Sequence, residues 1–278
     1  MNVLPREKQI KVISALVEGC SIRSVERMYD VHRDTIMRLM VRTGQHCMSI
    51  MDDTIQNVPA GKIECDEAWT FVRKKDHRYP LERPSPWHEG SQFVAVAMDR
   101  QTKLIITFRV GKRVPELALG VISDLKERLV GKPTIICDGW IAYYEAVAAV
   151  YGANGCNFAQ LVKTVTERKR KAAREGYTPA KVVSCRKYPI FGMVDFADIS
   201  TSIVERQNWT LCTAMRRMTR MSNGFSRKLE NLQAAVALHY CVYNFCRIHR
   251  TLRMTPAMAA GVVDTIWDID TLLPNHQS

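Results

Sequence analysis

Several features that define other protein classes are missing from this sequence. No uninterrupted apolar stretch approaches the ~20 residues that a membrane span requires, and residues 1–8 lack the apolar core of a secretory signal. The nine cysteines are an odd number and include no Cys-x-x-Cys pair, which argues against a disulfide framework or a zinc ribbon. We therefore expect a soluble, reduced, cytoplasmic protein with no membrane partner.

Acidic residues are also fewer than basic ones. The chain has 28 Asp and Glu against 40 Lys and Arg, which gives a formal net charge of +12 and a pI of about 9.4. This surplus argues against an average metabolic enzyme and favours a polyanionic partner. The 278 residues, 46% of them hydrophobic, suffice to bury the core of one large domain or two smaller ones.

The first 47 residues have the pattern of a small all-α domain. Helical periodicity covers residues 6–17, 21–29 and 33–42, and Ser21 is a good N-cap for the second helix. A short helix, a tight turn and a basic helix are typical of a helix-turn-helix DNA-binding domain, although a structural three-helix cap is the alternative. The side chains expected to contact DNA are Arg33, Asp34, Thr35, Arg38 and Arg42.

After an expected linker over residues 48–61, the pattern changes to that of a mixed α/β sheet flanked by helices. The predicted strands are 62–72, 92–98, 104–110 and 133–137, and the predicted helices are 114–129, 141–151, 202–220 and 225–245. We divide this region into a core over residues 62–222, with a basic insertion at about 163–200, and a helical extension over 223–278. The basic run of the insertion fits either a solvated loop or a phosphate contact: Arg168, Lys169, Arg170 and Lys171.

Three acids occupy positions where acids are unexpected. Asp66 lies within an apolar strand, Asp138 ends another strand, and Glu205 lies in a basic helix. A buried carboxylate without a partner costs several kcal/mol, so acids on central strands are usually paired or bind metal. Taken singly, each acid has an equally good structural explanation, such as a turn at Asp138 or an ion pair at Glu205. Taken together, they form an oxygen ligand set that suits two Mg²⁺ or Mn²⁺ ions and phosphodiester chemistry.

The segments around these acids resemble those of a known family. Residues 64–69 (ECDEAW), 137–143 (CDGWIAY) and 202–211 (SIVERQNWTL) are similar to bacterial DDE transposases, most closely to the insertion-sequence-one family. The tail over residues 243–256 resembles integrase-type transposase cores more broadly. Members of the family often begin with a cysteine-rich zinc finger, and this sequence has no such ligand set before its first helices.

The resemblance implies a ribonuclease-H-like fold and metal-dependent DNA strand cleavage and transfer at the terminal inverted repeats of an insertion sequence. It implies a catalytic, metal-binding triad of Asp66, Asp138 and Glu205, a homo-oligomer on paired DNA ends and a nucleoid-associated location. Basic and polar side chains on the helix after the triad are expected to position double-stranded DNA through its phosphates: Arg206, Asn208, Arg216, Arg217 and Arg220.

Two other functions remain open at this point. One is a catalytically inactive or domesticated DNA-binding protein, and the other is a DNA nuclease on the same fold. The three tryptophans nearest the triad, Trp69, Trp140 and Trp209, are expected to be core aromatics, with base stacking as the alternative.

Overall fold

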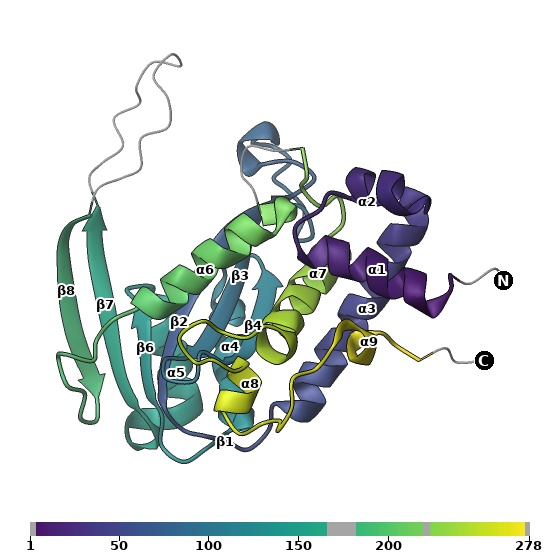
Figure 1. Cartoon of the computed structure of the whole chain (residues 1–278). Helices are drawn as coiled ribbons and strands as arrows, with labels where there is room; N and C mark the ends of the chain where they lie inside the picture. The colour runs from purple at the N-terminus through teal and green to yellow at the C-terminus, as the bar shows by residue number, and fades with distance from the viewer. Residues whose placement is uncertain (1–3, 166–181, 219–222, 276–278) are drawn as a thin grey trace.

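A six-stranded mixed sheet organises the chain (Figure 1). The computed structural model describes residues 4–165, 182–218 and 223–275. The sheet order is β4-β3-β2-β6-β7-β8. Strands β2, β6 and β7 run parallel, while β3, β4 and β8 are antiparallel to their neighbours. The strands are β2 Lys62–Val72, β3 Gly90–Asp99, β4 Ile105–Gly111, β6 Thr134–Asp138, β7 Asn157–Val165 and β8 Val182–Phe191.

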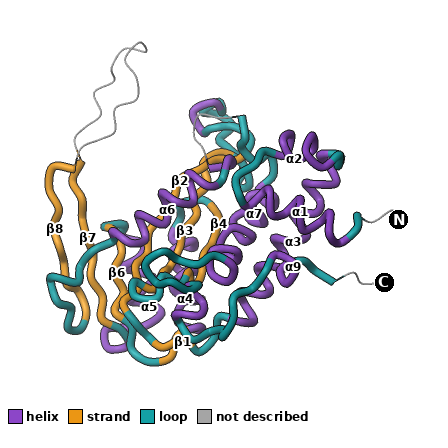
Figure 2. The backbone as a smooth tube through the Cα atoms, viewed as in Figure 1, coloured by secondary structure: helices purple, strands orange, loops and turns teal. Residues whose placement is uncertain are grey.

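Helices cover both faces of this sheet (Figure 2). On one face lie α4 (Pro115–Arg128) and α5 (Ile141–Gly155), which pack against each other and against the strands. On the other face lie α6 (Ser202–Ala214), against β2 and β3, and α7 (Leu229–Cys241), against β4. The mixed α/β fold expected from the sequence, a mixed sheet flanked by helices, is confirmed.

The predicted strand over residues 62–72 is confirmed to the residue, whereas the β7–β8 hairpin was not predicted. Every residue of β8 from Val182 to Pro189 is exposed, so the strand has no buried alternation that a sequence pattern could reveal. Pro189 is tolerated because β8 is an edge strand. The insertion expected at about 163–200 is thus partly sheet. Its basic run, residues 168–171, lies outside the described residues.

The N-terminal residues form three helices, α1 (Arg6–Val17), α2 (Ile22–Tyr29) and α3 (Arg33–Thr54). The Ser21 hydroxyl accepts a hydrogen bond from the Ser24 backbone N–H at 3.1 Å, which confirms the predicted N-cap. The predicted inward residues of α3 are buried, and its arginines at positions 33, 38 and 42 are exposed. A role for these helices in binding DNA stays a prediction.

Helix α3 is longer than the sequence analysis allowed. Residues 48–54, which we expected in a linker, continue the helix because Cys47, Met51 and Ile55 recur at helical spacing and are buried. The helix packs along α7, where a Cβ atom at Gly44 would come within 2.1 Å of the Ala234 carbonyl oxygen. One continuous hydrophobic core therefore joins the N-terminal helices to the sheet.

The remaining elements are short. A π-helical turn (Val242–Cys246) follows α7, and the C-terminal residues form α8 (Pro256–Ala259) and α9 (Ile269–Leu272). Two short strands, β1 (Val58–Pro59) and β5 (Leu129–Val130), pair in parallel apart from the main sheet. None of the helices in the described part of the chain has the length and apolarity needed to traverse a bilayer.

Candidate metal centre

Acidic side chains converge where strand β6 ends beside β2. The register of β2 and β6 pairs Cys65 with Cys137. The residues that follow them, Asp66 on β2 and Asp138 on β6, therefore lie side by side. Because β6 stops at Asp138, side chains of β2 beyond this point can converge past its end. Carboxylate oxygens of Asp66, Asp138 and a third residue, Glu67, lie within 4.8 Å of one another. We call these three residues the acidic cluster.

Glu67 was missed by the sequence analysis because successive residues of a strand point to opposite faces. Its side chain is only 4% exposed, and its Oε2 atom accepts a hydrogen bond from Arg113 Nε at 3.2 Å. Its Oε1 atom is buried and makes no hydrogen bond of normal geometry. Burial and the nearby Asp138 raise the pKa of Glu67. The only sequence signal was a second acid directly after Asp66 in an apolar strand.

Arg113 bridges two members of the cluster, and nothing in the sequence singled it out. Its guanidinium also lies 3.5 Å from Asp138 Oδ2 and stacks over the Trp140 ring, 4.4 Å from the ring centroid. The side chain is 37% exposed, so part of it reaches solvent. It is therefore placed to exchange a carboxylate partner for a phosphate.

Asp66 is the member of the acidic cluster whose pKa departs furthest from its ordinary value. Burial raises the pKa of Asp66 to about 7, and the charges of Glu67 and Asp138 act in the same direction. The Asn208 side-chain amide opposes this shift by donating to Asp66 Oδ2 at 2.9 Å. A carboxyl group in this setting is ionised most readily when a cation lies beside it.

The donor set of the cluster fits a hard divalent cation. All its ligand atoms are carboxylate oxygens, which Mg²⁺ and Mn²⁺ prefer to nitrogen or sulfur. Among the described residues, two buried oxygen acceptors at the cluster lack a hydrogen bond of normal geometry, Asn208 Oδ1 and Glu67 Oε1, although the Tyr143 hydroxyl lies beside the Glu67 carboxylate. Such atoms are usually satisfied in native proteins, and a cation would satisfy them. No other group of three such acidic, cysteine or histidine side chains lies this close in the described residues.

Glu205, the third acid predicted from sequence, is not part of the acidic cluster. Its Oε1 atom accepts hydrogen bonds from Lys163 Nζ of β7 and from the Thr201 hydroxyl, and its side chain is 42% exposed. The residue of α6 that contacts the cluster is Asn208, one turn later on the same helix face. Of the three acids predicted from sequence, the structure thus brings Asp66 and Asp138 together, and Glu205 lies one helical turn before the residue of α6 that contacts Asp66.

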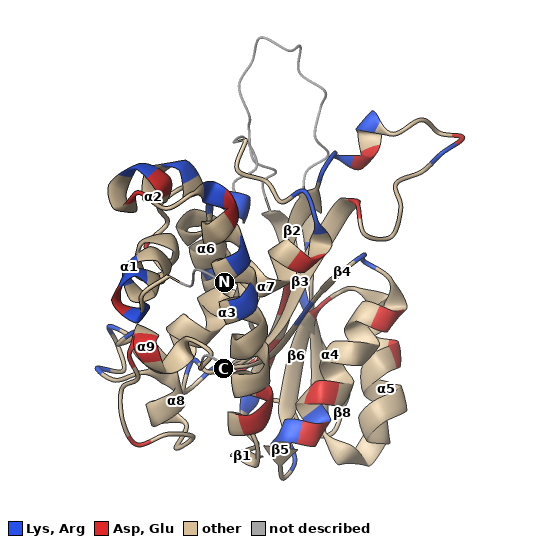
Figure 3. Cartoon of the chain, turned by 90° about the vertical axis from the view of Figure 1, so that its right-hand side faces the viewer, with Lys and Arg blue, Asp and Glu red and all other residues tan. Residues whose placement is uncertain are grey.

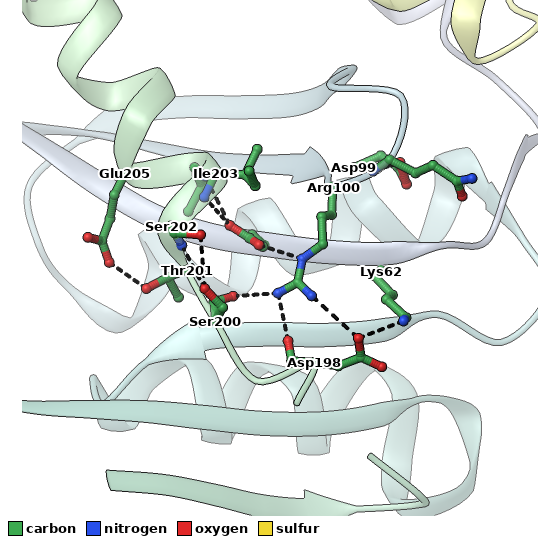
Figure 4. A network of polar contacts seen from close by, with 12 residues as sticks. Lys62, Asp99, Arg100, Asp198, Ser200, Thr201, Ser202, Ile203 and Glu205 are labelled. Atoms are coloured by element: carbon green, nitrogen blue, oxygen red, sulfur yellow. Dashed lines mark hydrogen bonds and ion pairs between the residues drawn. The ribbon is translucent and has the colours of Figure 1, made fainter. Parts of the chain in front are cut away.

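Buried polar contacts fix helix α6 to strand β2. Glu64, on the same face of β2 as Asp66, is fully buried and accepts hydrogen bonds from the backbone N–H groups of Ile203 and Val204, at 2.9 and 3.0 Å. Arg100 pairs with Glu64 at 2.7 Å and donates to the carbonyl oxygens of Asp198 and Ser200 (Figure 4). This network holds the first turn of α6, and with it Glu205 and Asn208, beside the acids.

Replacing Arg100 by alanine is expected to lower the free energy of unfolding by about 3 kcal/mol, because it leaves the buried Glu64 carboxylate without its cation. Urea denaturation measures this loss. The matched control is Lys228→Ala, which breaks an exposed pair with Glu230 and should cost less than about 1 kcal/mol. An equally small loss for Arg100→Ala would contradict the role given to this network.

The residues predicted to contact DNA differ in where they lie. On α3, Arg33, Asp34, Arg38 and Arg42 are exposed and Thr35 is partly exposed. Arg206 and Arg216 are also exposed. Asn208 is buried against Asp66, and Arg217 is half-buried, donating to Ser226 Oγ and contacting the Met37 and Met40 sulfurs, which removes both from the surface we assigned them to. Arg220 lies outside the described residues.

The tryptophans near the triad are not all core residues. Trp209 is 58% exposed, with the Arg206 guanidinium over its ring, so the expectation of burial is wrong for this residue. Trp140 is partly buried beneath Arg113, and Trp69 is partly buried with Lys75 over its ring. The exposed indole lies on α6 directly after Asn208 in the sequence, on the side of the helix that is turned to solvent.

Comparisons with known proteins give little. No family model and no curated protein matches the chain. Among solved structures, the mariner Mos1 paired end complex with Mg aligns at 14% identity and a TM-score of 0.22, covering 56% of this chain and 59% of that one. A pre-cleavage Mos1 transpososome aligns at 10% identity and a TM-score of 0.21, covering 57% and 60%. The chain thus spans less than two thirds of either protein, and the superpositions are too loose to bear on function.

Proposed function

We propose that this chain is a DDE transposase of the insertion-sequence-one type, which cleaves and joins DNA at element ends with two divalent cations. The observation that carries the proposal is the acidic cluster: oxygens of Asp66, Glu67 and Asp138, from two adjacent parallel strands, lie within 4.8 Å of one another in a chain of net charge +12. A cluster of carboxylates in an otherwise basic protein fits a site that binds a divalent cation while the surrounding surface binds a polyanion.

We assign one Mg²⁺ or Mn²⁺ to the acidic cluster and a second to Asp66 together with Glu205. When bound, such a pair of ions activates the attacking water or 3′-hydroxyl and stabilises the leaving oxygen of a phosphodiester. Asn208 orients the Asp66 carboxylate through its amide N–H. Arg113, already beside Glu67 and Asp138, turns its exposed edge to the phosphate and offsets its charge.

The DNA partner is assigned to several basic surfaces around this site. The exposed arginines of α3, together with Arg206 and Arg216, are proposed to hold the duplex, and the α1–α3 helices to recognise the element end. The basic run at residues 168–171 is proposed to contribute a further phosphate contact. Activity on paired ends implies a homo-oligomer, and we propose a cytoplasmic, nucleoid-associated location. In Figure 3, where the ribbon is coloured by residue type, blue Lys and Arg positions recur along α3.

The test is an assay of strand transfer. Purified protein is incubated with Mn²⁺ and a DNA fragment that carries the sequences flanking its gene, together with a supercoiled target plasmid. Joint molecules between fragment and target are the expected product. Hydrolysis without joining would make the protein a nuclease, and DNA binding without either reaction would make it a catalytically inactive DNA-binding protein.

The variant Glu205→Gln tests whether Glu205, rather than Glu67, is the acid that binds the second cation together with Asp66. We expect cleavage to fall roughly a hundredfold while one cation still binds, because the amide keeps the size of the side chain but loses the charge that holds the second ion. Glu230→Gln on the exposed side of α7 is the matched control and should leave cleavage unchanged. Cleavage within about twofold of the parent protein would remove Glu205 from the site and leave that role to Glu67.

A further inference from the structure

Strands β2 and β3 are joined by a long ordered loop, residues 73–89, which we call the β2–β3 arm. Antiparallel neighbours are usually joined by two to five residues, and loops longer than about 12–15 residues are usually functional or disordered. The arm contains a single 3-10 turn (Asp76–Arg78) and otherwise no regular structure. Figure 3 shows it extending away from the body of the protein at the end of β2.

The base of the arm is fixed by a set of hydrogen bonds. The Asp76 carboxylate accepts from the Ser85 hydroxyl at 2.8 Å and from the Ser91 backbone N–H at 3.0 Å. Glu89, 8% exposed, accepts from the Tyr79 hydroxyl and pairs with Arg73 at 2.8 Å. Three prolines at positions 80, 84 and 86 restrict the backbone of the outer part. The arm is therefore built to hold a shape rather than to fill space between strands.

The outer part of the arm exposes apolar and basic side chains together. Leu81 is 96% exposed and Trp87 is 73% exposed, the most exposed leucine and tryptophan in the described residues. Arg78 and Arg83 are also exposed and form no ion pair within the described part of the chain. Two of the three acids of the arm, Asp76 and Glu89, accept hydrogen bonds from residues at its base. A stable fold gains nothing from an exposed indole, so this surface points to a partner.

The arm is linked to the acidic cluster by two consecutive residues. Lys112 Nζ donates to Ser85 Oγ at 2.8 Å and to the Glu89 carbonyl oxygen at 2.5 Å. Its neighbour Arg113 contacts Glu67 and Asp138 of the cluster. Along β2, the arm begins after Val72, six residues beyond Asp66 and so about 20 Å away at about 3.3 Å per residue. DNA lying across the cluster would reach the arm.

We infer that the β2–β3 arm is a DNA-contacting element that receives the unpaired strand next to the acidic cluster. Trp87 and Leu81 stack on and wedge against exposed bases, and Arg78 and Arg83 neutralise the neighbouring phosphates. The combination of an exposed indole with guanidinium groups that form no ion pair in the described residues favours nucleic acid over an apolar protein surface. The inference rests on the proposed function for its partner, DNA, but not for the chemistry.

The test measures binding without catalysis. Fluorescence anisotropy in EDTA compares the protein with its Leu81→Ala/Trp87→Ala variant on a blunt duplex and on the same duplex with a single-stranded extension. We expect the variant to bind the extended duplex roughly tenfold more weakly, with little change on the blunt one. For Arg78→Ala/Arg83→Ala, the slope of the logarithm of the binding constant against the logarithm of the salt concentration should fall by the equivalent of about two phosphate contacts. Leu119→Ala, an exposed leucine on α4, is the control.

Outcomes that overturn the inference are distinct from those that overturn the proposed function. Both arm variants must keep the unfolding curve of the parent protein, as expected for exposed side chains. Equal affinity of parent and variants for the extended duplex would overturn the inference. So would loss of self-association in sedimentation without a change in DNA affinity, because the arm would then be a protein contact. A parent protein that binds through the arm but never cleaves would overturn only the enzymatic proposal.

Discussion

Replacing Asp138 by asparagine is expected to reduce metal-dependent DNA cleavage at least about a thousandfold, an increase of about 4 kcal/mol in the activation free energy. Asp138 contributes an oxygen to the acidic cluster, and the amide cannot supply the charge that holds a cation there. The fold should persist because asparagine retains the oxygen that accepts the Trp140 backbone N–H at 3.0 Å. A gel assay of cleavage products in Mg²⁺ and Mn²⁺ measures the effect.

Two comparisons make this result specific. Asp124→Asn, in an ion pair with Arg109 on the α4 side of the sheet, changes the same chemical group away from the cluster and should leave cleavage unaltered. DNA binding in EDTA should be equal for the parent protein and Asp138→Asn. If Asp138→Asn still cleaves in Mg²⁺ within tenfold of the parent rate, Asp138 is not a ligand and the proposed site is wrong.

Asp66→Asn is expected to stabilise the metal-free protein above neutral pH. Burial raises the pKa of Asp66 to about 7 from an ordinary value of 3.8, so the folded state binds this proton more tightly than the unfolded state. The contribution of Asp66 to stability is therefore greatest below about pH 4 and falls as the pH rises to about 7. The difference between these two pKa values corresponds to about 4 kcal/mol, as an order of magnitude.

Urea denaturation in EDTA at several pH values measures this effect. The groups that face Asp66 and Glu67 are Asp138, Asn208, Arg113 and Tyr143, and all of them remain in the variant. At pH 8 the Asp66→Asn protein should be the more stable by up to about 4 kcal/mol, and at pH 4 the two should be equal. A parent protein whose metal-free stability rises between pH 5 and pH 8 would contradict the assignment.

Part of this site can be predicted from sequence because strand geometry constrains it. An acid inside the apolar strand over residues 62–72 and an acid at the end of the strand over residues 133–137 must meet if the two strands are parallel neighbours, as they are. The helix that carries Glu205 is confirmed from Ser202 to Ala214, whereas its predicted end at residue 220 is wrong because the helix stops at Ala214. These predictions succeeded because hydrophobic pattern and strand length fix them locally.

Other parts depend on contacts that no local pattern encodes. The participation of Glu67 arises because β6 ends at Asp138, which lets an acid on the other side of β2 reach the cluster. Arg113 reaches it from the loop after β4, and Asn208 from α6, and both are fixed by packing between distant segments. Likewise β8 is exposed along most of its length, so its sequence has no hydrophobic alternation from which its backbone pairing with β7 could be predicted.

The central claim is that Asp66, Glu67 and Asp138 bind a divalent cation, and anomalous diffraction from crystals soaked in Mn²⁺ tests it most directly. We expect an anomalous peak in contact with carboxylate oxygens of Asp66 and Asp138, and no peak there in Asp138→Asn crystals treated in the same way. A map that shows Mn²⁺ bound elsewhere, with nothing at the cluster in the parent protein, would contradict the account.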